Sequence, residues 1–193
     1  MTEPTYRTAP RHTSYAARMP RIERPAMANY GVPDDTTDAL EWSWAKERLV
    51  ANKNYWVVTV DGFNRPHATP VWGVWTNDDR FWFSCDRDAY KARNIATNPH
   101  VTVMTDDTVE MVSVEGVAEA SVPGDVIPRL WAAKYAAYGE PEPDDTPATA
   151  DAAAEEMATF FASHAVFAVS PTKAIGMIER PEDFSRRATR WVF

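Results

Sequence analysis

The spacing of apolar side chains changes along the chain, and each change marks a new element. Residues 36–54, TTDALEWSWAKERLVANKN, show a mixed amphipathic pattern at helical spacing. Thr37 or Asp38 is placed to cap this helix and Glu41 to complete a capping box. Residues 55–85 then read as strands interrupted by the turn sequences DGFNRP and TNDD. The first half of the chain therefore predicts one helix followed by three antiparallel strands.

The second half predicts one short helix, a hairpin, two longer helices and a last strand. DAYKARNIATNP, residues 88–99, reads as a helix that Pro99 ends. The remaining segments follow in order: a hairpin at 100–121, helices at 123–139 and 149–164, a strand at 165–179 and a basic, aromatic C-terminus, RRATRWVF. Strands do not alternate regularly with long helices, which disfavours a parallel sheet. We expect a mainly β fold, a six-stranded antiparallel barrel with peripheral helices.

Composition excludes several classes of protein. The chain has 193 residues, 45% apolar and 25% charged, which is normal for one globular domain. A net charge of −8 argues against general binding to nucleic acid or to anionic membranes. The chain has no apolar run of about 18 residues, its N-terminus lacks the apolar core of a signal peptide, and Cys85 is its single cysteine. We therefore expect a cytoplasmic protein. The four histidines show no metal-ligand spacing, so no metal site is expected.

The N-terminal segment is basic although the chain is acidic. Residues 1–30 hold five arginines against two glutamates, a balance of +3 that leaves −11 for the remainder. Four prolines interrupt this segment. We predict an extended basic tail over residues 1–37 ahead of a barrel domain over 38–193. The tail is either a disordered end or a segment that lies on an acidic partner subunit.

The helix at 88–99 carries the first candidate site. Seven widely spaced glycines provide no GxGxxG and no phosphate-binding loop, so a bound phosphate must be held by side chains and a helix end. With Asp88 as the cap, Lys91 and Asn94 share a face of the helix. Lys91 lies in the first turn, where backbone N–H groups favour an anion and a cation opposes the helix dipole. The helix is therefore either an anion site or a solvated connector.

Pro70 marks the second candidate site, because proline cannot donate to a strand ladder. We expect the ladder to open at Thr69–Pro70–Val71 and to leave backbone polar groups free. Aromatic residues surround this position in sequence: Trp72, Trp75, Phe81, Trp82 and Phe83. A flat aromatic ligand edged by the backbone would fit such a place. The alternative is an edge strand over an aromatic core.

Three segments together resemble a known superfamily: RPHATPVWGVW, RFWFSCDRDAYKARNIATNPHVTVM and EMVSVEGVAE. They are similar to the pyridoxamine 5′-phosphate oxidase-like split-barrel flavoproteins, and most similar to the actinobacterial branch of flavin and deazaflavin oxidoreductases. The likeness covers about residues 40–122, with a weaker match at ATRWVF. Its most specific part is the K-x-x-N-I-x-x-N-P pattern of residues 91–99. The resemblance implies a split barrel of the FMN-binding type and a homodimer with two cofactor sites at the subunit interface.

The resemblance also implies which residues bind the cofactor. Lys91 would contact the cofactor phosphate, with Arg93 and Asn94 as helpers and Ser84 as a further contact. The ring system would lie along the proline-containing strand, against Thr69, Pro70, Val71 and Trp72. Coenzyme F-420, a deazaflavin, is favoured over FMN. The arginine pair and the full substrate-phosphate set of the true vitamin B6 oxidases are absent, so pyridoxamine phosphate is not the expected substrate.

The expected function is hydride transfer between the cofactor ring and a small conjugated organic substrate. The cofactor supplies this chemistry, so no catalytic acid or base is assigned. The alternative, from another class, is a non-catalytic carrier of flavin or haem on the same barrel, with His67 or His164 as an axial haem ligand. Cys85, beside Asp86 and Asp88, reads as a structural thiol.

Overall fold

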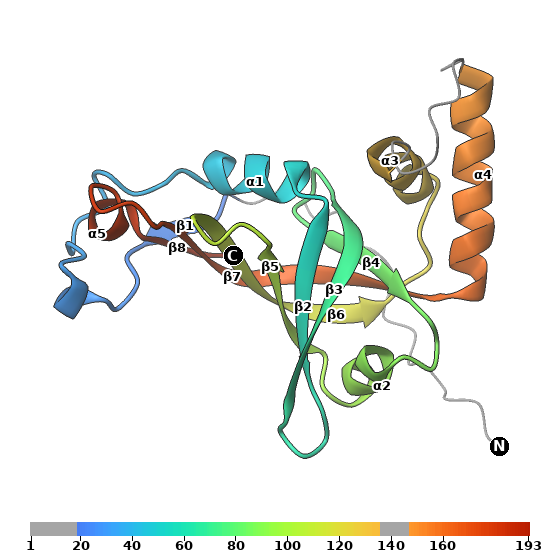
Figure 1. Ribbon diagram of the computed structural model, residues 1–193, viewed down its shortest axis with the longest axis horizontal. Coiled ribbons are helices and arrows are strands. Elements are labelled where there is room, and N and C mark those ends of the chain that lie inside the picture. The colour runs from blue at the N-terminus through green and yellow to red at the C-terminus, as the bar shows by residue number, and fades with distance from the viewer. Residues whose placement is uncertain (1–18, 136–146) are drawn as a thin grey trace.

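The computed structural model describes residues 19–135 and 147–193, in which six antiparallel strands close into a barrel with helices around it (Figure 1). Around the barrel the strand order is β4-β3-β2-β5-β6-β7, and pairing of β6 with β7 closes the ring. The strands are β2 (Asn54–Val60), β3 (Pro66–Trp75), β4 (Phe81–Cys85), β5 (His100–Thr105), β6 (Glu110–Ala120) and β7 (Ala165–Ile178). The expected six-stranded barrel is confirmed.

One edge of β7 is shared by two strands. Its first residues pair with β4, and residues 173–176 pair with β8 (Thr189–Val192). The short β1 (Arg21–Glu23) then pairs with β8 and is followed by the 3-10 helix η1 (Ala28–Tyr30). Arg24 holds this segment in place because its Nη1 donates to the carbonyls of Arg186 and Ala188, at 2.8 and 2.9 Å. Of the predicted basic tail, residues 1–18 lie outside the described residues.

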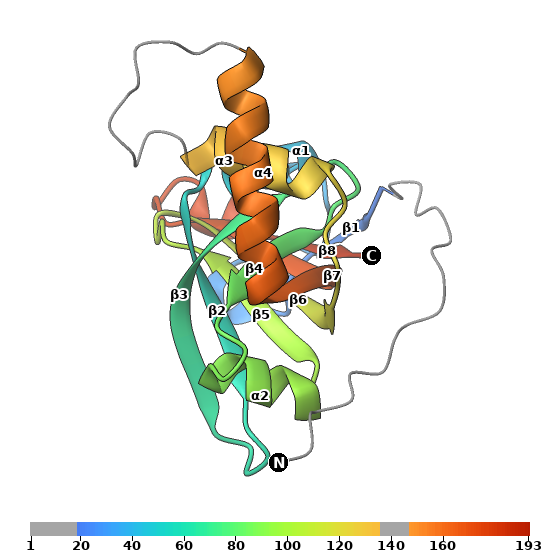
Figure 2. The ribbon, with the colours of Figure 1, turned by 90° about the vertical axis from the view of Figure 1, so that its right-hand side faces the viewer.

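The helices all lie outside the barrel wall. They are α1 (Trp42–Ala51), α2 (Tyr90–Thr97), α3 (Val126–Tyr135), α4 (Pro147–Ser163) and α5 (Phe184–Arg187). Figure 2 shows α4 standing across the barrel wall with α3 crossing behind it, while α2 lies at the opposite end of β2 and β3. The two helices predicted at 123–139 and 149–164 therefore form one layer over the barrel.

The predicted start of the first helix is wrong. Helix α1 begins at Trp42, and Glu41 at its N-cap makes no side-chain capping bond. The residues expected to start the helix form turns instead, because the chain is fixed to the barrel just ahead of Trp42. The Leu40 N–H donates to the Thr189 hydroxyl at 2.7 Å, and Leu40 itself is buried. This long-range bond holds the segment extended where a capping box was expected.

Apolar side chains form two separate clusters, one on each side of the barrel wall. The barrel core lies inside and includes Leu49, Tyr55, Phe81, Phe83, Val103, Val114, Phe167 and Trp191. The outer cluster lies between the barrel wall and the α3–α4 layer and comprises Val74, Trp82, Ile127, Trp131, Tyr135, Phe161, Val166 and Ala168. Strand alternation explains both clusters, because Phe81 and Phe83 point inward while Trp82 points outward.

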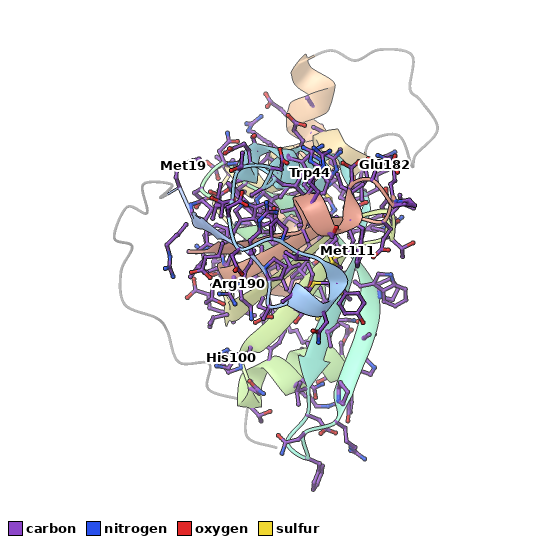
Figure 3. The ribbon with its side chains drawn as sticks, turned by 90° about the vertical axis from the view of Figure 1, so that its left-hand side faces the viewer. Met19, Trp44, His100, Met111, Glu182 and Arg190 are labelled. Atoms are coloured by element: carbon purple, nitrogen blue, oxygen red, sulfur yellow. The ribbon has the colours of Figure 1, made fainter. Side chains whose placement is uncertain are left out.

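The end of the barrel near β8 is tightly filled. Trp191 is fully buried, and its ring centroid lies 5.4 Å from that of Trp42. Gly176 permits this packing, since a Cβ at that position would stand 2.6 Å from the Trp191 ring. Figure 3 shows Trp44 and Arg190 at this end and His100 apart from them, beside α2.

Candidate functional site

The barrel splits along one edge of β3. The strand pairs with β2 over residues 66–72, but with β4 only over residues 73–75. Beyond that point β4 follows β7 instead, and Ser84 pairs with Val166. In the described part of the chain no strand pairs with residues 66–72 on the β4 side, and we call this stretch the open edge. The predicted opening at Pro70 is confirmed on this side, whereas Pro70 stays in register with Trp56 of β2.

The predicted ring-lining residues alternate between the two faces of β3. Val71 points into the barrel core and Thr69 points to the same side, whereas Pro70 and Trp72 point outward and are exposed. The Thr69 hydroxyl and His67 Nδ1 are buried and have no hydrogen-bond partner among the described residues. A single ring can therefore meet both Thr69 and Trp72 only across the open edge.

Lys91 is a half-buried cation on α2, the helix whose Tyr90 contacts His67 of the open edge. Its ammonium forms no hydrogen bond or ion pair with any residue within 19–135 or 147–193. Its charge acts on Cys85: burial raises the pKa of the Cys85 thiol, and Lys91 partly opposes that rise. A cation held without a protein counter-charge is suited to bind an anion. A thiol with a raised pKa is a poor nucleophile, in keeping with the structural role expected for Cys85.

Asn94 does not share an exposed face with Lys91. Its side chain is only 4% exposed, and its Nδ2 donates to the Thr59 hydroxyl of β2 at 2.9 Å. The helix starts at Tyr90 with Ala89 as its N-cap, so Asp88 does not cap it. Together with Ala92 and Ile95, Asn94 faces the barrel, and the boundary between buried and exposed positions passes between Lys91 and Asn94. A cofactor contact through Asn94 stays a prediction.

Arg93 turns back along its own helix. Its Nη1 donates to the Asp88 carbonyl, and its guanidinium lies 5.5 Å from the centroid of the Tyr90 ring. The Tyr90 hydroxyl in turn donates to Asp61 at 2.8 Å. Arg93 is thus occupied at the start of α2, which leaves Lys91 as the cation of this helix without a partner among the described residues.

A cleft of about 540 Å³ lies outside the barrel, between its wall and the α3–α4 layer. We call it the outer cleft. Its lining residues are Trp72, Ser84, Trp131, Ala132, Tyr135, Ala153, Glu156, Met157 and Phe160. Two predicted site residues, Ser84 and Trp72, belong to this wall because the split between β3 and β4 begins at them. The sequence offered no sign that residues from the two helices would meet them.

The end of α3 is anchored at the start of the split. The Gly73 N–H donates to the Tyr135 hydroxyl at 2.8 Å, and the Tyr135 ring stacks on Trp72 at 4.8 Å. Lys134 Nζ donates to the Tyr55 hydroxyl at 2.6 Å and to the Gly73 carbonyl at 3.0 Å. Burial lowers the pKa of Lys134 to about 8. Sequence reasoning missed Lys134, whose partners are distant in the chain.

The two histidines proposed for haem lie in different surroundings, because His164 Nδ1 has hydrogen-bond partners whereas His67 Nδ1 has none among the described residues. The His164 ring stacks on Phe160 at 3.8 Å, and its Nδ1 lies within hydrogen-bond distance of the Ser163 hydroxyl. The His67 ring contacts Tyr90 edge-on at 4.9 Å.

Among the residues that the structure describes, no three His, Cys, Asp or Glu side chains gather as metal ligands. Across the same residues, no helix has the length and apolar character needed to cross a bilayer.

Comparisons with known proteins agree with this architecture. The family model described as pyridoxamine 5′-phosphate oxidase matches residues 45–173. A conserved hypothetical protein from Mycobacterium tuberculosis is 16% identical, with a TM-score of 0.56 over 72% of this chain and 85% of its own. An FAD-binding protein from Mesorhizobium loti is 15% identical, with a TM-score of 0.50 over 80% of this chain and 96% of its own.

A structure described as an F-420 reductase is 20% identical, with a TM-score of 0.47 over 67% of this chain and 94% of its own. No curated protein matches the sequence. The likeness to the Mycobacterium tuberculosis and Mesorhizobium loti structures, at 16% and 15% identity, establishes the fold alone.

Proposed function

We propose that this chain, which belongs to the pyridoxamine 5′-phosphate oxidase-like family of split-barrel proteins, is an oxidoreductase with a flavin-type cofactor. The cofactor would lie along the open edge of β3 with its phosphate at Lys91. Hydride would pass between its ring and a small conjugated organic substrate. The observation that carries the proposal is the half-buried Lys91 ammonium, which has no counter-charge among the described residues, on the helix whose Tyr90 contacts the open edge at His67.

The residues present fit such a group. An anionic phosphate would satisfy Lys91, and the first-turn N–H groups of α2 favour the same charge. The unpaired backbone groups of residues 66–72 would form hydrogen bonds with the polar edge of a ring. The buried Thr69 hydroxyl, which lacks a partner among the described residues, lies on the same strand. Unpaired buried polar groups cost free energy, so a ligand that pairs them gains affinity.

The chain's own part in the reaction is to bind and orient. Lys91 would neutralise the phosphate, the open edge would fix the plane of the ring, and Trp72 would shield the outer side from water. When bound, the ring supplies the hydride chemistry. No side chain is assigned as a catalytic acid or base.

We favour F-420 over FMN because the K-x-x-N helix and the TPVW strand resemble the deazaflavin branch. Titration of the purified protein with both cofactors tests this choice. FMN absorbs near ~450 nm and F-420 near ~420 nm, because each chromophore has its own spectrum. A sharp Soret band in the protein as isolated would instead support the haem carrier.

We also propose that the chain works as a homodimer in the cytoplasm. Trp56 and Trp72 are 41% and 44% exposed on the outward face of β2 and β3, beside the exposed Pro70. A contiguous apolar surface of this kind is usually covered in solution. Light scattering should show a species of twice the 21.7 kDa chain mass. A species of the single-chain mass alone would contradict the dimer.

A further inference from the structure

The outer cleft has the size and lining of a ligand site. Its volume of about 540 Å³ lies within the range of roughly 300–1,000 Å³ that small-molecule pockets occupy. Most of its lining is aromatic or aliphatic, and its polar side chains are Ser84 on the barrel wall and Glu156 on α4. An apolar pocket with a few placed polar groups is the usual form of a site for an organic molecule.

Its position joins it to the proposed cofactor site. Trp72 and Ser84 form the wall of the cleft at the point where β3 leaves β4 and the open edge begins. Figure 2 shows the α3–α4 layer facing this side of the barrel, with α2 below it. A molecule in the cleft would therefore lie next to a ring bound along the open edge.

The wall on the barrel side is held rigidly. Trp72 and Tyr135 stack with an interplanar angle of 11°, and the Tyr135 hydroxyl bonds to the backbone at Lys53 and Gly73. The opposite wall is more adaptable, because Met157 is flexible and Phe160 is 37% exposed. A fixed aromatic face opposite an adaptable one suits a flat ring, because little order is lost when the ring binds.

The charge of Glu156 limits which ligands the outer cleft can bind. Glu156 is the one charged side chain among the described residues that line the cleft, and no hydrogen bond or ion pair links its carboxylate to another of them. On the same two helices Arg129 and Asp151 form an ion pair with each other, and Lys134 is bonded to Tyr55 and Gly73. An anionic ligand would be repelled by Glu156, whereas a cationic group or a hydrogen-bond donor would be attracted.

We propose that the outer cleft is the substrate subsite, and that it takes a flat aromatic molecule, neutral or cationic, whose hydrogen-bond donor faces Glu156. The role as a substrate subsite rests on the proposed function. The binding preference rests on the cleft itself, and the two can be tested separately.

Three naphthalene probes that share one ring system test the preference: 2-naphthylmethylamine as the cation, 2-naphthylmethanol as the neutral ligand and 2-naphthoate as the anion. Calorimetry on the full chain should rank the amine first and the carboxylate last. Glu156→Gln should weaken the amine about two- to fivefold and leave the alcohol nearly unchanged. Phe160→Ala should weaken all three about two- to tenfold. Glu155→Gln, on the same helix but outside the cleft lining, is the matched control.

Cofactor titrations on the same variants separate the two proposals. Unchanged F-420 and FMN binding in Glu156→Gln and Phe160→Ala, together with probe binding that persists in the presence of cofactor, supports a separate substrate subsite. Displacement of the probe by the cofactor would overturn the inference, because the cleft would then hold the cofactor. Equal effects of Glu155→Gln and Glu156→Gln, or no probe binding, would also overturn it. Probe binding without any cofactor binding would keep the cleft as a site and reject the proposed function.

Discussion

The barrel core and the outer face of β2 and β3 use the same residue type in opposite ways. Inside, Trp191 and Trp42 are 0% and 3% exposed and pack against each other. Outside, Trp56 and Trp72 keep more than two fifths of their surface exposed. The difference follows from the face that each side chain occupies. Trp42 and Trp191 pack against each other at the closed end of the barrel, where tryptophan stabilises the fold. Trp56 and Trp72 point outward from β2 and β3, where a ligand or a second subunit could cover them.

The largest expected effect concerns the buried tryptophans, which we expect to stabilise the fold. Trp191→Ala should lower the free energy of unfolding by about 3–5 kcal/mol, because it empties a fully buried site that the surrounding strands cannot fill. Urea denaturation measures the loss. Trp56→Ala, at an exposed position, should cost less than about 1 kcal/mol. Similar losses in the two variants would remove the distinction between the two sets of tryptophans.

The variant Lys91→Ala tests whether residues near the open edge bind the cofactor. Loss of a charge-assisted phosphate contact should weaken cofactor binding by about 1.5–3 kcal/mol, or roughly ten- to a hundredfold. Stability should change little, because the Lys91 side chain forms no hydrogen bond or ion pair with a described residue. Arg93→Ala should bind cofactor nearly as well as wild type, since Arg93 is occupied by Asp88 and Tyr90. Wild-type affinity in Lys91→Ala would place the anion site elsewhere.

Asn94→Leu should affect both cofactor binding and the stability of the fold. We predict weaker cofactor binding than in Arg93→Ala and also a loss of about 1–3 kcal/mol in stability, because the buried Thr59 hydroxyl loses its donor. The second effect can be isolated by the double variant Asn94→Leu/Thr59→Val. Its loss should be smaller than the sum of the two single losses. Strict additivity of the unfolding free energies would show that the bond contributes nothing.

The smallest expected effect concerns Lys134, which joins α3 to the barrel. Burial lowers its pKa to about 8 from a normal value of 10.5, so between these values the unfolded chain binds more protons than the folded one. Stability relative to Lys134→Met should therefore rise as the pH increases from about 8 to 10.5. Partial exposure of the side chain makes the rise modest. Denaturation at several pH values measures it, and a constant difference would mean that the ammonium is not perturbed.

Local patterns predicted the barrel, because turn residues and alternation lie close together in sequence. The opening at Pro70 was predictable in part, since proline cannot donate to a strand ladder, but the open edge spans residues 66–72 because β4 leaves β3 to follow β7. The predictions that were wrong, the start of the first helix and the exposed face of Asn94, depended on partners distant in the sequence. Thr189 fixes Leu40 and delays the start of α1, and Thr59 draws Asn94 into the interior. The outer cleft was missed because its walls come from β3, β4 and two later helices, which no local spacing connects.

Titration of the purified protein with F-420 and FMN side by side, in wild type and Lys91→Ala, tests the central claim most directly. We expect F-420 to bind at micromolar concentration, Lys91→Ala to weaken that binding at least about tenfold, and the reduced cofactor to consume no oxygen without an acceptor. Tightly bound FMN with oxygen uptake would replace F-420 by FMN at the same site. Binding of neither cofactor would contradict the claim that the open edge of β3 and Lys91 form a flavin-type site.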